Sequence, residues 1–310
     1  MKKTAITVII LMLAAVLAAA VCVSCTTGPD EPSGSPTDGS RTSGPEITAT
    51  TTEKPADDPT AAPTDVSSQT ETPTPDRTEK PDSKPLSGVV IYINAGHQGK
   101  GMTGKEPLAP WGPEYNGQYN NTVTKTKCTS GTEGRFTHVA EHVVTLQIAL
   151  KLQALCEEQG ATVVMSRTTE DVTKSNVERA LEANECGADI ALHIHCNGSE
   201  NQNANGVEVY VRGEGKKTEA YKKLEDKDYI LGLSILEEIC RTTGAKKRYV
   251  SKSDNYSTIN WAEMSSLIIE CGFMSNEEED NLLVSDSYQN KLAQGMLNFL
   301  LKEFGILLPA

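Results

Sequence analysis

The amino-acid sequence predicts an α/β domain in which helices cover both faces of a mainly parallel sheet. Short, continuous apolar runs bounded by turn residues recur between residues 88 and 270, as expected of strands that are buried on both faces. Segments with apolar residues at helical spacing follow most of these runs. Alternation of strands and helices implies a parallel sheet with helices on both sides. We expect one domain, residues 87–310, to hold all these elements.

The first predicted strand covers residues 88–94, a continuous run of Val, Ile and Tyr between turn residues. The long segment 98–137 follows, which is rich in Gly, Asn, Thr and Pro and shows no periodicity. Segments of this length inside a compact domain are usually functional or disordered. Its rings, Trp111, Tyr115 and Tyr119, either contact a substrate or pin the loop to the domain.

The remaining elements are predicted from the same two patterns. Apolar residues recur at helical spacing between residues 143 and 155, and Gly160 is placed to end that helix. By these criteria, further strands are predicted at 161–165, 188–195, 206–211 and 266–270, and further helices at 176–185, 228–243 and 288–304.

The N-terminal residues 1–25 are typical of a secretory signal peptide, because two lysines precede an apolar run at 5–23 and small residues follow it. The run is long enough to span a bilayer, so an uncleaved anchor is the alternative. Cys25 stands where bacterial lipoprotein signals carry the cysteine that becomes lipid-modified, although Cys22 replaces the usual leucine. We therefore expect an exported protein at the outer face of the cytoplasmic membrane or in the cell wall, attached through Cys25.

Residues 26–86 are dominated by Thr, Ser, Pro and acidic residues and contain almost no large apolar side chain. Such a segment cannot bury enough surface to offset its ordering entropy, so we predict a disordered linker that resembles an extracellular stalk. The formal net charge of the chain is −13. This acidity argues against nucleic acid as a partner.

The cysteines beyond the signal region show no CxxC pair, and four fall within apolar segments. Although an even number in an exported chain would suggest disulfides, this placement favours mostly free, buried thiols. They are Cys128, Cys156, Cys186, Cys196, Cys240 and Cys271.

Polar residues with metal-binding chemistry gather at the predicted strand ends. In a parallel sheet the active site lies beyond the carboxyl ends of the strands. His97, His195 and Glu270 follow or end three strands, and Glu141 opens a helix whose start should lie at the same edge. Neutral imidazole and carboxylate are ligands of catalytic zinc. All five histidines of the chain lie in these segments, namely His97, His138, His142, His193 and His195.

Four stretches together resemble the motifs of a known family, the zinc-dependent N-acetylmuramoyl-L-alanine amidases of the amidase-3 type. They are Asn-Ala-Gly-His-Gln-Gly at 94–99, the helix that begins with Glu141, Ile-His-Cys-Asn at 194–197 and Ile-Glu-Cys-Gly-Phe-Met-Ser-Asn at 269–276. The resemblance covers residues 88–305 in the right order, and the combination is specific although no single motif is.

The resemblance implies a mixed, mostly parallel sheet flanked by helices on both faces. It implies zinc ligands at His97, Glu141 and His195 and a catalytic glutamate at Glu270. The expected reaction is zinc-dependent hydrolysis of the amide between N-acetylmuramic acid and L-alanine in peptidoglycan. Two other readings are a cell-wall binding module without turnover and a zinc peptidase or deacetylase acting on peptidoglycan.

Some assignments remain open at the level of sequence. His138 is one helical turn before Glu141 and either replaces or assists it, and Glu133 is a more remote candidate ligand. Strand periodicity places His193 on the same face as His195, where it is a core histidine, a support for a ligand or itself a ligand.

For two further polar residues, the sequence supports a structural role and a functional role equally well. Arg167 is either a salt-bridged surface residue or a substrate contact, and Asn197 is either a turn residue or a substrate contact.

Overall fold

The computed structural model describes residues 84–114, 118–214 and 218–305. The predicted signal peptide, Cys25 and nearly all of the predicted linker lie outside the described residues. None of the helices in the described ranges is both long enough and apolar enough to cross a membrane.

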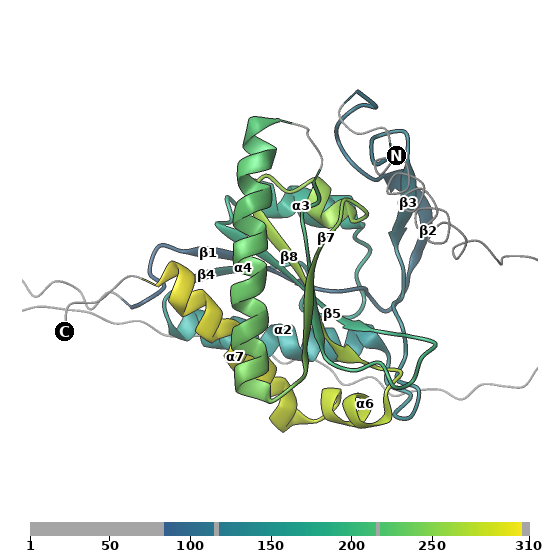
Figure 1. Ribbon diagram of the computed structural model, residues 1–310, viewed down its shortest axis with the longest axis vertical. Coiled ribbons are helices and arrows are strands. Elements are labelled where there is room, and N and C mark those ends of the chain that lie inside the picture. The colour runs from purple at the N-terminus through teal and green to yellow at the C-terminus, as the bar shows by residue number, and fades with distance from the viewer. Residues whose placement is uncertain (1–83, 115–117, 215–217, 306–310) are drawn as a thin grey trace, which may run out of the picture. The chain divides into compact units, whose positions relative to one another are not determined.

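A six-stranded sheet forms the centre of the domain, in the order β4-β1-β5-β8-β6-β7 (Figure 1). Neighbouring strands are parallel, except that β6 runs antiparallel to β8. The prediction of a mixed, mostly parallel sheet is therefore confirmed. The strands are β1 (Val90–Ala95), β4 (Thr162–Met165), β5 (Ile190–Asn197), β6 (Val207–Val211), β7 (Lys247–Lys252) and β8 (Ser265–Phe273).

Helices cover both faces of this sheet, as the strand and helix alternation predicts. On one face, α7 packs against both α2 and α4, while α3 and α5 pack together on the other (Figure 1). The helices are α2 (Glu141–Glu158), α3 (Asn176–Glu185), α4 (Glu219–Thr243), α5 (Ser257–Asn260), α6 (Glu277–Leu283) and α7 (Asp286–Phe304).

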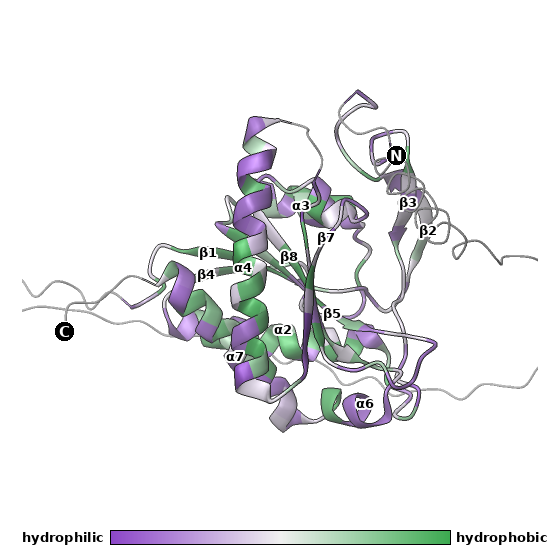
Figure 2. Cartoon of the chain, in the orientation of Figure 1, coloured by the Kyte–Doolittle hydropathy of each residue, from purple (hydrophilic) through white to green (hydrophobic). Residues whose placement is uncertain are grey.

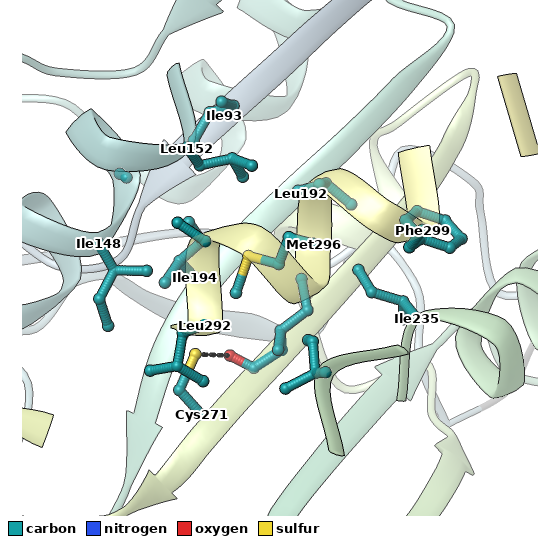
Figure 3. Close-up of a cluster of buried hydrophobic side chains, with 14 of the residues drawn as sticks. Ile93, Ile148, Leu152, Leu192, Ile194, Ile235, Cys271, Leu292, Met296 and Phe299 are labelled. Atoms are coloured by element: carbon teal, nitrogen blue, oxygen red, sulfur yellow. Dashed lines mark hydrogen bonds between the residues drawn. The ribbon is translucent and has the colours of Figure 1, made fainter. Parts of the chain in front are cut away.

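The main core lies between the sheet and helices α2, α4 and α7. Figure 3 shows Leu192 and Ile194 of β5 facing Met296 of α7, with Leu152 of α2 beside them. Each such side chain contributes about 1.5–3 kcal/mol when fully removed from water. Since side chains alternate across a strand, the residues between these apolar positions point to the opposite face. His193, His195 and Glu270 are on that opposite face.

The segment 98–137 contains regular structure that the sequence did not predict. Strands β2 (Met102–Pro107) and β3 (Thr124–Cys128) pair antiparallel as a separate two-stranded sheet. Between them, Trp111 donates a hydrogen bond from Nε1 to the Tyr119 carbonyl at 2.7 Å and contacts the Tyr221 ring edge-on. These contacts favour the structural reading of Trp111. Tyr115 lies outside the described residues.

Three differences from the predicted elements affect the sheet and the site most. Helix α4 begins at Glu219, nine residues earlier than predicted, because its first turns are hydrophilic and carry no apolar stripe (Figure 2). Strand β7 was not predicted, because its sequence is largely polar. Strand β8 continues to Phe273, so Glu270 lies within the strand and not at its end.

The six cysteines of the described residues are all free thiols, and four of them are buried. This agrees with the interpretation of these residues as small core side chains.

Candidate metal centre

The structure brings His97, Glu141 and His195 together at the carboxyl edge of the sheet. His97 follows β1, His195 lies near the end of β5, and Glu141 is the first residue of α2. His97 Nε2 is 3.2 Å from Glu141 Oε2, and His195 Nδ1 is 3.1 Å from Glu141 Oε1. Candidate ligand atoms of the three side chains lie within 4.8 Å of one another. We name these three residues the triad.

The spacing of these atoms fits a divalent metal. Two ligand atoms at zinc bond lengths on a tetrahedral ion lie about 3.3 Å apart. The two measured separations from Glu141, 3.1 and 3.2 Å, are close to that value. Two imidazoles and one carboxylate also form a three-ligand set that leaves a fourth position open, as in catalytic zinc sites.

The Glu141 carboxylate is buried and is held by two backbone amides. Thr132 N donates to Oε2 at 2.9 Å, and Cys196 N donates to Oε1 at 3.1 Å. Burial by itself would raise the Glu141 pKa, but the hydrogen bonds with His195 and His97 outweigh it, so the net pKa is lowered. The carboxylate is therefore ionised, which is the form that binds a metal.

The ring of His97 is oriented by Thr129. His97 Nδ1 lies 2.9 Å from the Thr129 carbonyl oxygen. Because a carbonyl only accepts hydrogen bonds, this contact places a proton on Nδ1. Nε2, which faces Glu141, would supply its lone pair to a metal. His97 has a φ of 58°, a left-handed backbone conformation that is uncommon for a residue with a side chain.

His195 is kept in the neutral form required of a metal ligand. Burial is the largest cause that lowers its pKa, and the neighbouring His97 acts in the same direction, against the opposing effect of Glu141. The rings of His97 and His195 meet edge to face, with centroids 4.8 Å apart.

Two glycines allow the backbone to approach the triad closely. A Cβ on Gly96 would lie 2.5 Å from His195 Cε1, and a Cβ on Gly131 would lie 2.7 Å from Glu141 Oε2. Gly131 also has a φ of 88°, which favours glycine. A side chain at either position would displace a member of the triad.

Two buried arginines hold the turn that carries His97. Arg179 donates to the carbonyl oxygens of Ala95 and His97, and Arg167 donates to those of Ala95 and Gly96, at distances of 2.9–3.1 Å. The sequence left Arg167 as a surface residue or a substrate contact. Both readings were wrong, because its guanidinium is buried and occupied by backbone carbonyls. The two arginines therefore fix the backbone that presents a candidate ligand.

Glu270 lies on β8 beside His195 of β5 in the parallel register. Its Oε2 atom is buried and has no hydrogen-bond partner among the described residues. Burial raises the Glu270 pKa, and the negative charges of Glu141 and Glu208 raise it further. A buried carboxyl oxygen without a partner is costly unless it serves a ligand or a reaction.

A cavity of about 400 Å³ opens over the triad and Glu270. Strand β3, the start of α3 and the segment from β7 to α5 supply its other walls. The lining residues are His97, Lys125, Thr126, Thr129, Asn176, His195, Asn255, Tyr256, Ser257, Thr258, Ile268 and Glu270.

The other histidine candidates lie outside the triad. His138 precedes α2 with a φ of 55°, so the expectation that it shares a helix face with Glu141 was wrong. Its side chain is 76% exposed and lies 3.6 Å from Glu133. His193 is fully buried between Asn94 and Ser266, 2.9 Å from each, and burial lowers its pKa to about 3.

Glu208 is a buried residue near the site that the sequence reasoning missed. It lies opposite Glu270 in the antiparallel pairing of β6 with β8. Asn197 Nδ2 donates to Glu208 Oε2 at 3.0 Å, Tyr210 donates to the same oxygen, and Arg248 forms an ion pair with Oε1. The available signal was a lone glutamate within the apolar run of 206–211. Asn197 thus contacts an internal carboxylate.

Comparison with known proteins identifies the family. The family described as N-acetylmuramoyl-L-alanine amidase matches residues 91–302. The germination-specific N-acetylmuramoyl-L-alanine amidase of Bacillus subtilis strain 168 is 25% identical over 238 residues, which cover 73% of this chain and 84% of that protein. The N-acetylmuramoyl-L-alanine amidase CwlM of Bacillus licheniformis is 31% identical over 169 residues, covering 54% of this chain and 61% of that protein.

Solved structures agree on the fold. The crystal structure of the N-acetylmuramyl-L-alanine amidase Ami1 from Mycobacterium smegmatis matches with a TM-score of 0.60 and 20% identity, covering 71% of this chain and 100% of that chain. The N-acetylmuramoyl-L-alanine amidase from Clostridium difficile 630 matches with a TM-score of 0.54 and 24% identity, covering 70% and 96%. With the family match spanning more than half of its residues, this chain belongs to the N-acetylmuramoyl-L-alanine amidase family.

Proposed function

We propose that this protein is a zinc-dependent hydrolase that cleaves the amide bond between N-acetylmuramic acid and L-alanine in peptidoglycan. One observation carries the proposal, in a chain that belongs to this family. An ionised glutamate lies between two histidines at metal-binding distances, and a second carboxyl group, one oxygen of which has no hydrogen-bond partner among the described residues, lines the same cavity.

In this proposal His97, Glu141 and His195 would hold the zinc ion. A zinc ion held there would lower the pKa of its bound water and polarise the scissile carbonyl. Glu270 takes the proton of the attacking water and returns it to the leaving L-alanine nitrogen as the carbon–nitrogen bond breaks. The absence of a hydrogen bond to Glu270 Oε2 from the described residues leaves that oxygen available for proton transfer.

In the proposal, the N-terminal region exports the protein and holds its catalytic domain near the cell wall. Residues 1–25 direct export, and lipid modification of Cys25 anchors the protein to the outer face of the membrane. Residues 26–86 act as the linker that lets the catalytic domain of residues 87–310 reach a cell wall outside the membrane.

The presence of Glu270 in the cavity favours turnover over a binding module that has lost catalysis. Binding alone would not require a carboxyl group with a buried, unpartnered oxygen beside the triad, since burial of that oxygen costs free energy.

Metal analysis and product analysis test the proposal together. Purified protein should contain about one zinc per chain, and the double variant His97→Ala/His195→Ala should lose it. Mass spectrometry of products from muropeptides should show release of the intact stem peptide with a free L-alanine amine. Cleavage inside the peptide, or loss of acetate alone, would instead identify a peptidase or a deacetylase.

The variant Glu270→Gln separates catalysis from metal binding. Because Glu270 transfers a proton and does not bind the metal, this variant should retain zinc while turnover falls by about 10² or more. Full activity would remove Glu270 from the mechanism. Loss of zinc would make it a ligand.

A further inference from the structure

The wall of the cavity formed by β3 carries one positive charge. Among the described residues that line the cavity, Lys125 is the single lysine or arginine. The lining also includes Glu270, and Glu141 lies beside the two histidines of the lining. The cavity is therefore acidic at its catalytic end and basic at its β3 end, in a chain whose formal net charge is −13.

Lys125 differs from the other two lysines of the β2–β3 hairpin. Lys105 donates from Nζ to Thr126 Oγ1 at 2.9 Å. The positive charge of Lys127 acts on Glu106 and Glu178 and favours the ionised form of each carboxyl group, although burial raises the Glu106 pKa overall. For Lys125, by contrast, no hydrogen bond or ion pair is found among the described residues, and its side chain is only partly exposed. A lysine that lines a cavity and forms no ion pair among the described residues is suited to an anionic ligand.

The position of Lys125 along β3 relates it to the triad. Thr129, which orients the His97 ring, follows Lys125 by four residues, or about 13 Å of extended chain. Three residues of an extended peptide span about 10 Å. The lysine side chain, about 6 Å from Cα to Nζ, covers part of this separation, and Lys125 lines the same cavity as His97 and His195. The remaining distance of about 7 Å corresponds to two extended residues, so a peptide whose first amide lies at the triad and which runs along β3 reaches Lys125 with its second residue.

We propose that Lys125 binds a free carboxylate of the stem peptide, on the second residue beyond the scissile amide. The inference rests on the function proposed above and specifies the direction in which the peptide lies in the cavity. In peptidoglycan the residue after L-alanine is a glutamate joined through its side-chain carboxyl group, so its α-carboxyl group is either free or amidated. Lys125 distinguishes these two forms, because an ammonium group pairs with a carboxylate and only weakly with a neutral amide.

Two muropeptides that differ only in this group provide the test. One carries the free α-carboxylate on the glutamate and the other the amide, which has nearly the same shape. The native enzyme should cleave the free form with a kcat/KM about tenfold higher, the range of a charge-assisted hydrogen bond. The difference should lie mainly in KM, because a remote contact binds the ground state and the transition state equally.

Matched variants of the hairpin identify the residue responsible. Lys125→Met should abolish the preference, so that kcat/KM is about the same for the free and the amidated muropeptide. Lys125→Arg should keep the preference. Lys127→Met is the control. It also removes one positive charge from β3, but the Lys127 side chain does not line the cavity. Circular dichroism and thermal melting establish that each variant is folded.

The possible outcomes are distinct. Cleavage of both muropeptides by the native enzyme at equal kcat/KM overturns the carboxylate site and leaves the proposed function intact. A preference that persists in Lys125→Met, or that Lys127→Met also removes, assigns it to another group and likewise overturns the proposal. Cleavage of neither muropeptide by zinc-loaded native enzyme refutes the proposed function itself and the inference with it.

Discussion

Gly131 provides a direct measure of how tightly the backbone surrounds the proposed metal ligands. A Cβ at this position would lie 2.7 Å from Glu141 Oε2 and 2.8 Å from His97 Cδ2, whereas ordinary Cβ contacts begin near 3.4 Å. The variant Gly131→Ala therefore forces two proposed ligands to move by several tenths of an ångström. It also places a side chain at a φ of 88°.

A second glycine separates the steric effect from the backbone effect. Gly244, at the end of α4, has a similar φ of 79°, but a Cβ there would meet nothing within 4 Å. The free energy of unfolding of Gly244→Ala should therefore fall only by the penalty for a side chain in the left-handed backbone conformation, about 1–2 kcal/mol. For a domain of this size each kcal/mol lowers Tm by about 2–4 °C. Gly131→Ala should show a comparable loss of stability and, in addition, about 10–100-fold weaker zinc binding.

The assay is zinc competition with a chromophoric chelator, combined with thermal unfolding of the metal-free proteins. The informative quantity is the difference between the two variants, because both contain the same added methyl group. If Gly131→Ala binds zinc as tightly as Gly244→Ala, the backbone does not constrain the triad and the reasoning from close approach is wrong.

Two further predictions concern stability away from the triad. Asp228→Ala removes the carboxylate that lies 3.1 Å from the fully buried Arg212 guanidinium and leaves that charge without a counter-charge, so the free energy of unfolding should fall by about 3–5 kcal/mol; an unchanged urea midpoint would contradict this. In the capping box of α3, Ser175 N donates a hydrogen bond to the Glu178 carboxylate and lowers the Glu178 pKa. The ionised carboxylate therefore stabilises the fold at pH values above the ordinary glutamate pKa. This stabilisation is lost as the pH falls through the folded-state pKa. Glu178→Gln should thus be less stable than the native protein at pH 7, with a gap that closes in acid; a gap independent of pH would refute the role of this charge.

Elements with strong local signals were predicted accurately. Helix α3 has the predicted bounds of 176–185, because Ser175 and Glu178 form a capping box before it and Gly187 follows its end with a positive φ. Strands β1, β5 and β8 were found because both of their faces are buried and the apolar runs are continuous.

Elements that depend on distant partners were missed. Strand β7 is an edge strand with a largely polar sequence, and it exists because β6 pairs with it. Strands β2 and β3 contain few apolar residues and are defined by their mutual pairing. Local patterns contain no information on such pairing, so sequence reasoning described the whole segment as a loop.

The convergence of the triad was predicted because the carboxyl ends of parallel strands meet at one edge of a sheet. What the sequence could not provide was the backbone that supports these residues. His138 has a positive φ, so it does not continue the helix that begins at Glu141, and no pattern in the sequence predicts this backbone conformation. Burial of Arg167 beneath the β1 turn likewise depends on the assembled fold.

The anchoring of Glu141 by the backbone amides of Thr132 and Cys196 has a consequence for metal exchange. Folding alone arranges the carboxylate, so the ligand cage is preorganised before any ion enters it. Every divalent ion then meets the same fixed set of donor positions, and selection among ions rests on each ion's own preferred coordination geometry. Removal of the ion with a chelator should accordingly leave a folded domain that accepts a replacement ion, in contrast to small zinc domains that unfold without their metal.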